Sequence, residues 1–258
     1  MLYRVIGLMS GSSLDGLDIA YVELEELGGK WSYTIPYADC IGYDGEWAQR
    51  LRQAADLQVA PFMALHAEYG HLTGKLVNAF IDKNELAYKV AMVSSHGHTV
   101  FHRPGKFTVQ IGDGAALAAE TGLPVVSDLR AMDVALGGQG APIVPMGEKL
   151  LFPDTHFFLN IGGIANISLN SGSTFDAFDV CPANRVLNIV AEKIGLPFDK
   201  DGLIAAEGRM VESLLEELNG LEYYKRDFPK SLDNSFGTGI ATATFDWEAD
   251  KKIRDAYP

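Results

Sequence analysis

The chain has 258 residues, of which 47% are hydrophobic and 21% are charged, close to the averages of soluble globular proteins. This composition excludes a mainly disordered chain, a collagen, a coiled coil and a disulfide scaffold, and the length allows two lobes with a cleft between them. The net charge of −13, without any basic run, argues against nucleic acid and anionic membranes as partners.

Two cysteines, Cys40 and Cys181, stand far apart and form no CxxC motif, so a zinc ribbon or a thioredoxin-type site is not supported. The apolar stretch from Val5 to Met9 is too short for the core of a signal peptide, and no run approaches the length of a membrane span. We therefore expect a cytoplasmic protein.

The first half of the chain alternates predicted strands and helices. Residues 3–9 and 18–25 are typical of strands joined by a turn rich in glycine and serine. The elements predicted after them are a strand at 31–43, helices at 45–57 and 60–84, a buried strand from 90 that ends in a polar loop, a short strand at 107–111, a helix at 114–121 closed by Gly122, and a strand at 123–130. Residues 135–142 (ALGGQGAP) are the candidate hinge.

The second half begins with another strand–glycine–strand unit, FFLNIGGIANISL at 157–169, followed by a strand at 174–180. Helices are predicted at 184–195, with Asn184 as N-cap, and at 206–219. Two such units, each followed by further strands and helices, indicate a pseudo-repeated α/β protein with lobes at 1–140 and 141–258.

The segment GLMSGSSLDGLD at 7–18 is the first candidate site. A glycine-containing loop between strands presents backbone N–H groups to a phosphate, and serine hydroxyls add donors. Asp15 and Asp18 could hold Mg²⁺ directly or through water. The loop is not a Walker A motif, because Leu17 and Asp18 stand where Lys and Ser/Thr belong. A solvated turn explains the same residues.

The segment SHGHTVFHRP at 95–104 places His96 and His98 two residues apart, which would put both on one face of a strand. No fourth metal ligand is evident and HExxH is absent, so hydrogen bonding to a polyhydroxylated ligand is favoured over a metal.

Charged side chains gather at the predicted strand ends from 110 to 142, and they are Asp113, Asp128, Arg130 and Asp133. Ligands of α/β sheets sit at the carboxyl ends of strands. Arg130 is the group best suited to a carboxylate or phosphate, although a structural Arg–Asp pair is an equal alternative.

The second unit offers two further candidates. Gly162 and Gly163 would let a backbone approach phosphates closely, although a tight hairpin explains them equally well. Asp179 stands at the end of a strand, where a carboxylate can act as a general base. Asp176 is its rival, but strand alternation places the two on opposite faces.

Taken in order, these motifs resemble the anhydro-N-acetylmuramic acid kinase family of cell-wall recycling enzymes, over residues 7 to about 236. The match rests on GLMSGSSLDGLD, SHGHTVFHRP, QIGDGAALA, TGLPVVSDLR, DVALGGQGAPIVP, NIGGIANIS, FDAFDVCPAN, FDKDG and PKS. The resemblance implies a two-lobed α/β fold of the ribonuclease H-like (actin, hsp70 and sugar-kinase) type, with mixed sheets flanked by helices and an interlobe cleft. It also implies a homodimer.

The resemblance further implies that the protein opens the 1,6-anhydro ring with water and phosphorylates O6, using ATP and Mg²⁺. Asp179 would be the catalytic base, and His96, His98, Thr99 and Arg130 would lie near the sugar. The residues implied at the nucleotide are Gly11, Ser12, Ser13, Leu14, Asp15, Gly16, Leu17, Asp18, Gly162 and Gly163. A homologue that binds a muramyl sugar without catalysis is the alternative.

Two departures from the family pattern bear on that alternative. Val180 and Cys181 replace a Thr-Gly pair beside the predicted base. No late glycine-rich adenosine motif occurs, so we expect an incomplete second lobe.

Overall fold

The structure is a computed structural model that describes residues 1–11, 14–103, 105–228, 230–232, 236–237 and 239. The chain divides into two compact units, Met1–Phe152 and a second unit that begins at Pro153. The sequence analysis placed this boundary after residue 140. In the structure the next helix, α5 (Val144–Leu151), packs on strand β3 (Lys30–Gly42), which assigns it to the first unit.

The first unit is built on a mixed sheet with strand order β3-β2-β1-β4-β5, and β6 pairs with β4. The remaining strands are β1 (Leu2–Ser10), β2 (Gly16–Leu27), β4 (Met92–Arg103), β5 (Phe107–Ile111) and β6 (Val125–Val126). β1, β2 and β3 form an antiparallel meander, whereas β4 runs parallel to β1. A parallel neighbour requires a crossover connection, and the helical segment between β3 and β4 supplies it.

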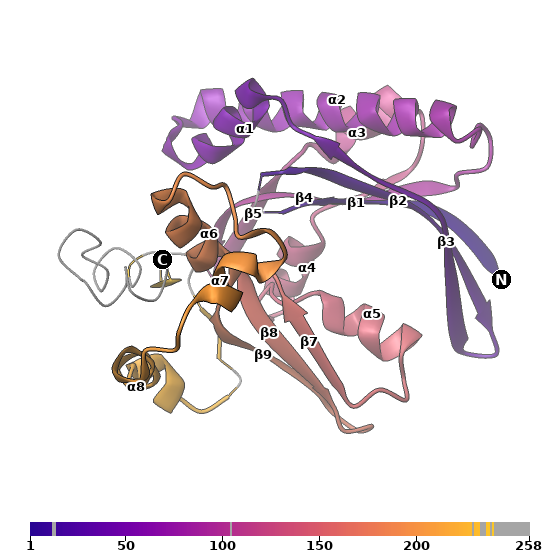
Figure 1. Cartoon of the computed structure of the whole chain (residues 1–258). Coiled ribbons are helices and arrows are strands. Elements are labelled where there is room, and N and C mark those ends of the chain that lie inside the picture. The colour runs from indigo at the N-terminus through magenta and orange to yellow at the C-terminus, as the bar shows by residue number, and fades with distance from the viewer. Residues whose placement is uncertain (12–13, 104, 229, 233–235, 238, 240–258) are drawn as a thin grey trace. The chain divides into compact units, whose positions relative to one another are not determined.

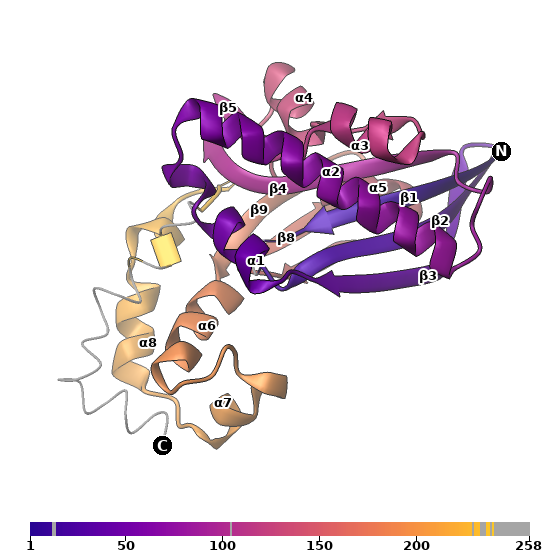
Figure 2. The ribbon, with the colours of Figure 1, turned by 90° about the horizontal axis from the view of Figure 1, so that it is seen from above.

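The helices of the first unit cover both faces of this sheet (Figure 1). They are α1 (Gly45–Arg52), the short 3₁₀ turn η1 (Ala54–Asp56), α2 (Val59–Lys83), α3 (Gly114–Thr121), α4 (Leu129–Ala135) and α5. α2 and α3 lie side by side over the sheet (Figure 2), and Gly70 permits their contact because a Cβ there would lie 2.6 Å from Asp113 O.

The main core lies between the sheet and α2. Ile6 and Ile19 from the sheet pack with Val77 and Phe80 from α2, and each is 2% exposed or less. Burial of one such side chain contributes about 1.5–3 kcal/mol. This apolar layer anchors the strand ends that carry the candidate site.

The second unit repeats the opening meander of the first. Strands β7 (Phe157–Ile161), β8 (Ile164–Asn170) and β9 (Phe175–Pro182) form an antiparallel sheet in the order β7-β8-β9. The helices after them are α6 (Asn184–Lys193), η2 (Lys200–Gly202), α7 (Leu203–Glu207), α8 (Glu212–Asn219) and η3 (Glu222–Lys225). The predicted ribonuclease H-like α/β class is confirmed, with the same three-stranded start in both units.

Several local predictions were wrong. The strand predicted at 123–130 ends at Val126, because Asp128 adopts a left-handed φ of 58° and helix α4 follows. β4 continues to Arg103 through the segment expected to be a loop, because β5 pairs with it. The helix predicted at 206–219 is divided between α7 and α8, and the N-cap of α6 is Ala183 rather than Asn184.

Candidate active site

The turn between β1 and β2 is the predicted nucleotide loop. Ser12 and Ser13 fall outside the described residues. Around them, the Leu14 amide donates to Gly11 O at 3.4 Å, and Leu14 has a left-handed φ of 59°. The Asp15 side chain accepts from the Gly16 amide at 3.1 Å. The chain therefore reverses tightly at the point where phosphate-binding N–H groups were predicted.

The last residues of the predicted loop belong to strand β2, and two of them have structural roles. Leu17 is 2% exposed and packs in the main core, so its side chain cannot contact a nucleotide. Gly16 is set by close packing, because a Cβ there would lie 2.6 Å from Ile41 O of β3. Asp18 differs because its side chain is exposed.

Asp15 and Asp18 are the acidic groups of the first unit that suit Mg²⁺. Both carboxylates are exposed, and they lie at the start of β2, on either side of the buried residues Gly16 and Leu17. Within the described residues no group of three or more His, Cys, Asp or Glu side chains could enclose a metal. Mg²⁺ typically binds one or two carboxylates together with substrate phosphates rather than an all-protein cage, so this pair fits it.

A β-bulge separates the two predicted sugar-binding histidines. Leu8 pairs with Ser95 and Ser10 pairs with His98, so β4 carries an extra residue opposite β1. Gly97 adopts a φ of 71° within this bulge. The prediction that His96 and His98 share one strand face was wrong, because the bulge interrupts the alternation and turns them toward different partners.

His96 is held by Arg130 of helix α4. Arg130 Nε donates to His96 Nε2 at 2.7 Å, and Arg130 Nη1 donates to Gly140 O at 2.7 Å. His96 Nδ1 lies 2.8 Å from Gly97 O, to which it donates as the neutral tautomer. Burial, and then the Arg130 charge, lower the pKa of His96. His96 is therefore a neutral group that orients the guanidinium.

His98 ends a buried chain of hydroxyl groups. The hydroxyl of Tyr69 is hydrogen-bonded to that of Tyr43, Tyr43 donates to Ser10 Oγ at 2.8 Å, and Ser10 Oγ lies 3.0 Å from His98 Nδ1. Ser10 Oγ accepts from Tyr43, and the direction of its bond with His98 Nδ1 is set by the tautomer of the ring. Burial, and then His96, lower the pKa of His98 to about 4.

Sequence analysis missed this chain. Ser10 is 2% exposed and Tyr69 is fully buried. The sequence analysis placed Ser10 in the turn whose serine hydroxyls were considered for phosphate binding, whereas the structure buries it at the end of β1. Tyr69 lies inside the predicted helix at 60–84, where apolar periodicity was the signal. A buried tyrosine implies a partner for its hydroxyl, but the sequence does not show which partner.

Thr99 lies next to His98 on β4, opposite Gln110 of β5. Gln110 Nε2 donates to Thr99 Oγ1 at 3.2 Å and to Thr108 Oγ1 at 2.7 Å. Gln110 is 5% exposed, and its Oε1 has no hydrogen-bond partner among the described residues. Thr99, Thr108 and Gln110 therefore form a polar cluster on β4 and β5, next to His98.

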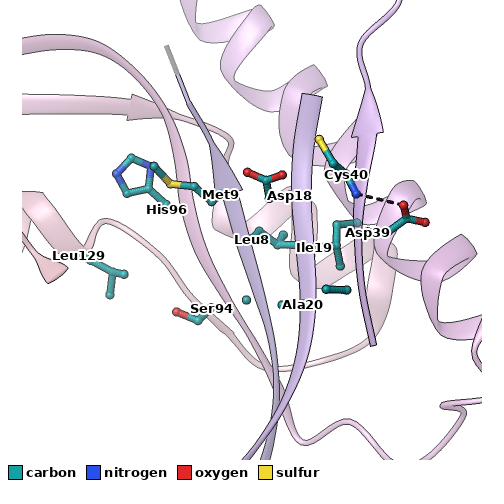
Figure 3. Close-up of a pocket in the computed structure, with 12 residues that line it drawn as sticks. Leu8, Met9, Asp18, Ile19, Ala20, Asp39, Cys40, Ser94, His96 and Leu129 are labelled. Atoms are coloured by element: carbon teal, nitrogen blue, oxygen red, sulfur yellow. Dashed lines mark hydrogen bonds between the residues drawn. The ribbon is translucent and has the colours of Figure 1, made fainter. Parts of the chain in front are cut away.

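An open pocket of about 580 Å³ lies on the sheet face opposite the main core. His96, Met9, Asp18 and Cys40 lie in a row across four neighbouring strands (Figure 3). Between them the floor is made of small residues such as Gly7 and Ala20. The predicted sugar-contacting His96 and the predicted Mg²⁺ ligand Asp18 thus face one pocket.

Asp179 of β9 is fixed by residues that come much later in the chain. Asp179 Oδ2 accepts from Ser231 Oγ at 3.0 Å and from the Leu232 amide at 2.8 Å. Its backbone is held as well, because its amide donates to Lys230 O at 3.0 Å and the Tyr223 hydroxyl donates to Asp179 O at 2.6 Å. We call Tyr223, Lys230, Ser231 and Leu232 the Asp179 brace.

Lys230 belongs to the PKS segment, which the sequence analysis quoted only as part of the family match. Lys230 Nζ donates to Tyr223 O and Arg226 O at 3.2 and 3.0 Å. Its ammonium also lies 4.8 Å from the centre of the Tyr223 ring. Lys230 therefore fastens the brace to the end of η3.

A second bulge adjoins Asp179. Asn166 pairs with Asp179 and Ala165 pairs with Cys181, which leaves Val180 as the additional residue. Such a bulge can re-aim a neighbouring side chain. Asp176 precedes it in regular register, and its carboxylate accepts from Thr174 in the turn before β9. The prediction that these two aspartates lie on opposite faces follows this register.

Gly162 and Gly163 have a structural role that the sequence did not reveal. Gly163 O accepts from the amides of Ala183 and Arg185, and Gly162 O accepts from the Asn184 amide. These carbonyl groups cap the first turn of α6, whose initial N–H groups have no partner within the helix. The assignment of both glycines to the nucleotide stays a prediction.

The fold and these motifs define a ribonuclease H-like α/β protein with the loops of a sugar kinase. A family model described as anhydro-N-acetylmuramic acid kinase matches residues 3–239. The chain belongs to this family.

Relatives named "Anhydro-N-acetylmuramic acid kinase" come from several bacteria. The Methylorubrum extorquens protein is 40% identical, with 90% of this chain and 68% of that protein covered. The Azorhizobium caulinodans protein is 39% identical, with 90% and 67% covered. The Aliivibrio fischeri protein is 36% identical, with 95% and 68% covered. Among the described residues, no helix is long and apolar enough to cross a membrane.

Proposed function

We propose that this protein is an ATP-dependent kinase that converts 1,6-anhydro-N-acetylmuramic acid to N-acetylmuramic acid 6-phosphate, with ring opening coupled to phosphoryl transfer. The observation that carries the proposal is the Asp179 carboxylate, whose Oδ2 accepts both hydrogen bonds from the brace. Membership of the anhydro-N-acetylmuramic acid kinase family supports the substrate and the use of ATP.

In the proposed reaction Asp179 takes a proton from water, and the water oxygen bonds to the anomeric carbon. The bond from that carbon to O6 breaks, O6 bonds to the γ-phosphorus of ATP, and the bond from that phosphorus to the bridging oxygen breaks to release ADP. Water enters opposite the departing O6, so the anomeric configuration inverts, as in base-assisted inverting glycosidases.

The loop at 11–18 is the proposed holder of the ATP phosphates. Asp15 and Asp18 would hold Mg²⁺, which when bound with the nucleotide neutralises charge on the transferring phosphoryl group. The tight reversal at Leu14 and the exposed Asp18 support this assignment. Leu17 contributes through its backbone only, because its side chain is in the core.

Arg130 is the proposed partner of the acid group of the sugar. Its bonds to His96 and Gly140 use two of five N–H donors and fix the plane of the guanidinium. His98 and Thr99 would contact the sugar from β4. A cytoplasmic location and a homodimer stay predictions. Family membership gives no support to the non-catalytic alternative.

The direct test uses 1,6-anhydro-N-acetylmuramic acid, ATP and Mg²⁺ in ordinary water and in oxygen-18 water. We expect a 6-phosphorylated sugar that carries one heavy oxygen at the anomeric carbon, read by mass spectrometry. Phosphorylated sugar without the label would contradict coupled hydrolysis. Thermal shifts with ATP and with sugar, measured separately, show whether a failure to form product comes from binding or from chemistry.

A further inference from the structure

We propose that Ser231 is a positioning residue, which binds one oxygen of Asp179 and thereby assigns the other oxygen to accept the proton from water. This inference rests on the proposed function, in which Asp179 is the base. Ser231 and Leu232 both donate to Oδ2, so the carboxylate cannot rotate without breaking two hydrogen bonds.

The residues of the Asp179 brace have two separate roles. Tyr223 and Lys230 bind the backbone of Asp179, at its carbonyl oxygen and its amide, and therefore fix where the residue lies. Ser231 and Leu232 bind the carboxylate itself and therefore fix how it is turned. Tyr223 is 2% exposed and Leu232 is 7% exposed, so the brace is anchored in the core of the second unit, whereas Ser231 is exposed.

The two donors also make the two oxygens of the carboxylate unequal. A hydrogen bond to a carboxylate favours its ionised form over its protonated form, and bonds to a charged acceptor are the stronger kind. Oδ2 is thereby satisfied and becomes the weaker base. The proton from water is then taken by Oδ1, for which the described brace provides no donor. Loss of the Ser231 hydroxyl should make protonation of Asp179 easier.

Tyr223 of η3 and Cys181 of β9 are neighbours of Asp179 that stay protonated over the acidic range. Burial, and then Asp179, raise the pKa of Tyr223 to about 12, so its hydroxyl remains a donor. Burial raises the pKa of Cys181 and keeps the thiol neutral. Neither group therefore changes charge within the acidic limb of the activity profile.

The test compares Ser231→Thr with Ser231→Val, which have the same shape and differ in the hydroxyl group. We expect Ser231→Thr to keep the wild-type profile of kcat/KM against pH. Ser231→Val should lower kcat about tenfold with little change in KM for the sugar, and should move the acidic limb to higher pH. Tyr223→Phe is the structural control and should lower Tm without moving the limb.

Coincident profiles for Ser231→Thr and Ser231→Val would overturn the inference. A second measurement does not require turnover: selective carbon-13 labelling of aspartate carboxyl groups, with Asp179→Asn to assign the signal, gives the titration midpoint by NMR. The midpoint should rise in Ser231→Val. A raised midpoint in a protein that makes no product would refute the proposed function alone, whereas an unchanged midpoint would refute the role of Ser231.

Discussion

The two units secure their candidate groups in opposite ways. In the first unit, His98 and Ser10 are nearly inaccessible to solvent and belong to a buried chain that ends at Tyr69. In the second unit, Asp179 is partly exposed at a strand end and is held by the brace, a segment much later in the chain. The first arrangement places the bonding groups inside the core, and the second relies on residues far along the chain, of which Tyr223 and Leu232 are buried and Ser231 is exposed.

Because of this contrast, substitutions in the two units should have different consequences. Desolvation keeps His96 and His98 neutral, so these two rings act as fixed dipoles beside the charged Arg130 and Asp18 of the first unit. Asp179 must ionise to act as a base, and partial exposure permits this. We therefore expect substitutions in the first unit to affect stability first, and substitutions at Asp179 to affect turnover first.

The largest effect is expected for Asp179→Asn. Loss of a general base lowers kcat by about 10²–10⁴-fold. The fold should survive, because the asparagine oxygen can still accept from Ser231 and Leu232. Product formation and the unfolding midpoint are the two measurements. Asp176→Asn, on the opposite strand face, should retain activity. Turnover near the wild-type rate in Asp179→Asn would refute the assignment of the base.

Gly97→Ala tests the expectation that substitutions in the first unit lower stability. The left-handed φ of 71° is strained for alanine, and the new Cβ would lie 2.7 Å from Ile111 O. Together these should lower the free energy of unfolding by about 2–5 kcal/mol, measured in urea. Gly105→Ala is the matched control, since Gly105 has a φ of 68° but open space around its Cβ position. Equal losses in both variants would show that the contact with β5 is unimportant.

The smallest effect concerns pH. The pKa of His98 in the folded protein is about 4, below the usual 6.5, so the unfolded chain binds more protons between these values. Stability should therefore be complete above pH 6.5 and fall by about 2–3 kcal/mol as the pH drops toward 4. His98→Gln should flatten this dependence in urea titrations, whereas His156→Gln in the second unit should not. A wild-type curve that stays level from pH 6.5 to 4 would contradict the buried neutral state.

The sequence by itself determined much of the fold. Alternating apolar residues located β1, β2 and β9, and the periodicity of residues 60–84 located α2. Such patterns record which face of an element is buried, and a short stretch of residues contains that information. The ordered motifs also sufficed to identify the family, and they brought Asp18, His96 and Asp179 forward as candidates.

Only the tertiary structure decided how these candidates are held. The bulges at Gly97 and Val180 arise from the pairing of strands, which no single strand encodes. Ser10 meets His98 across 88 positions in the chain, and Ser231 meets Asp179 across 52. Hydrogen bonds over such separations form after loop closure and strand register are fixed. The sequence therefore supplied the chemical groups, and the packed chain selected their partners.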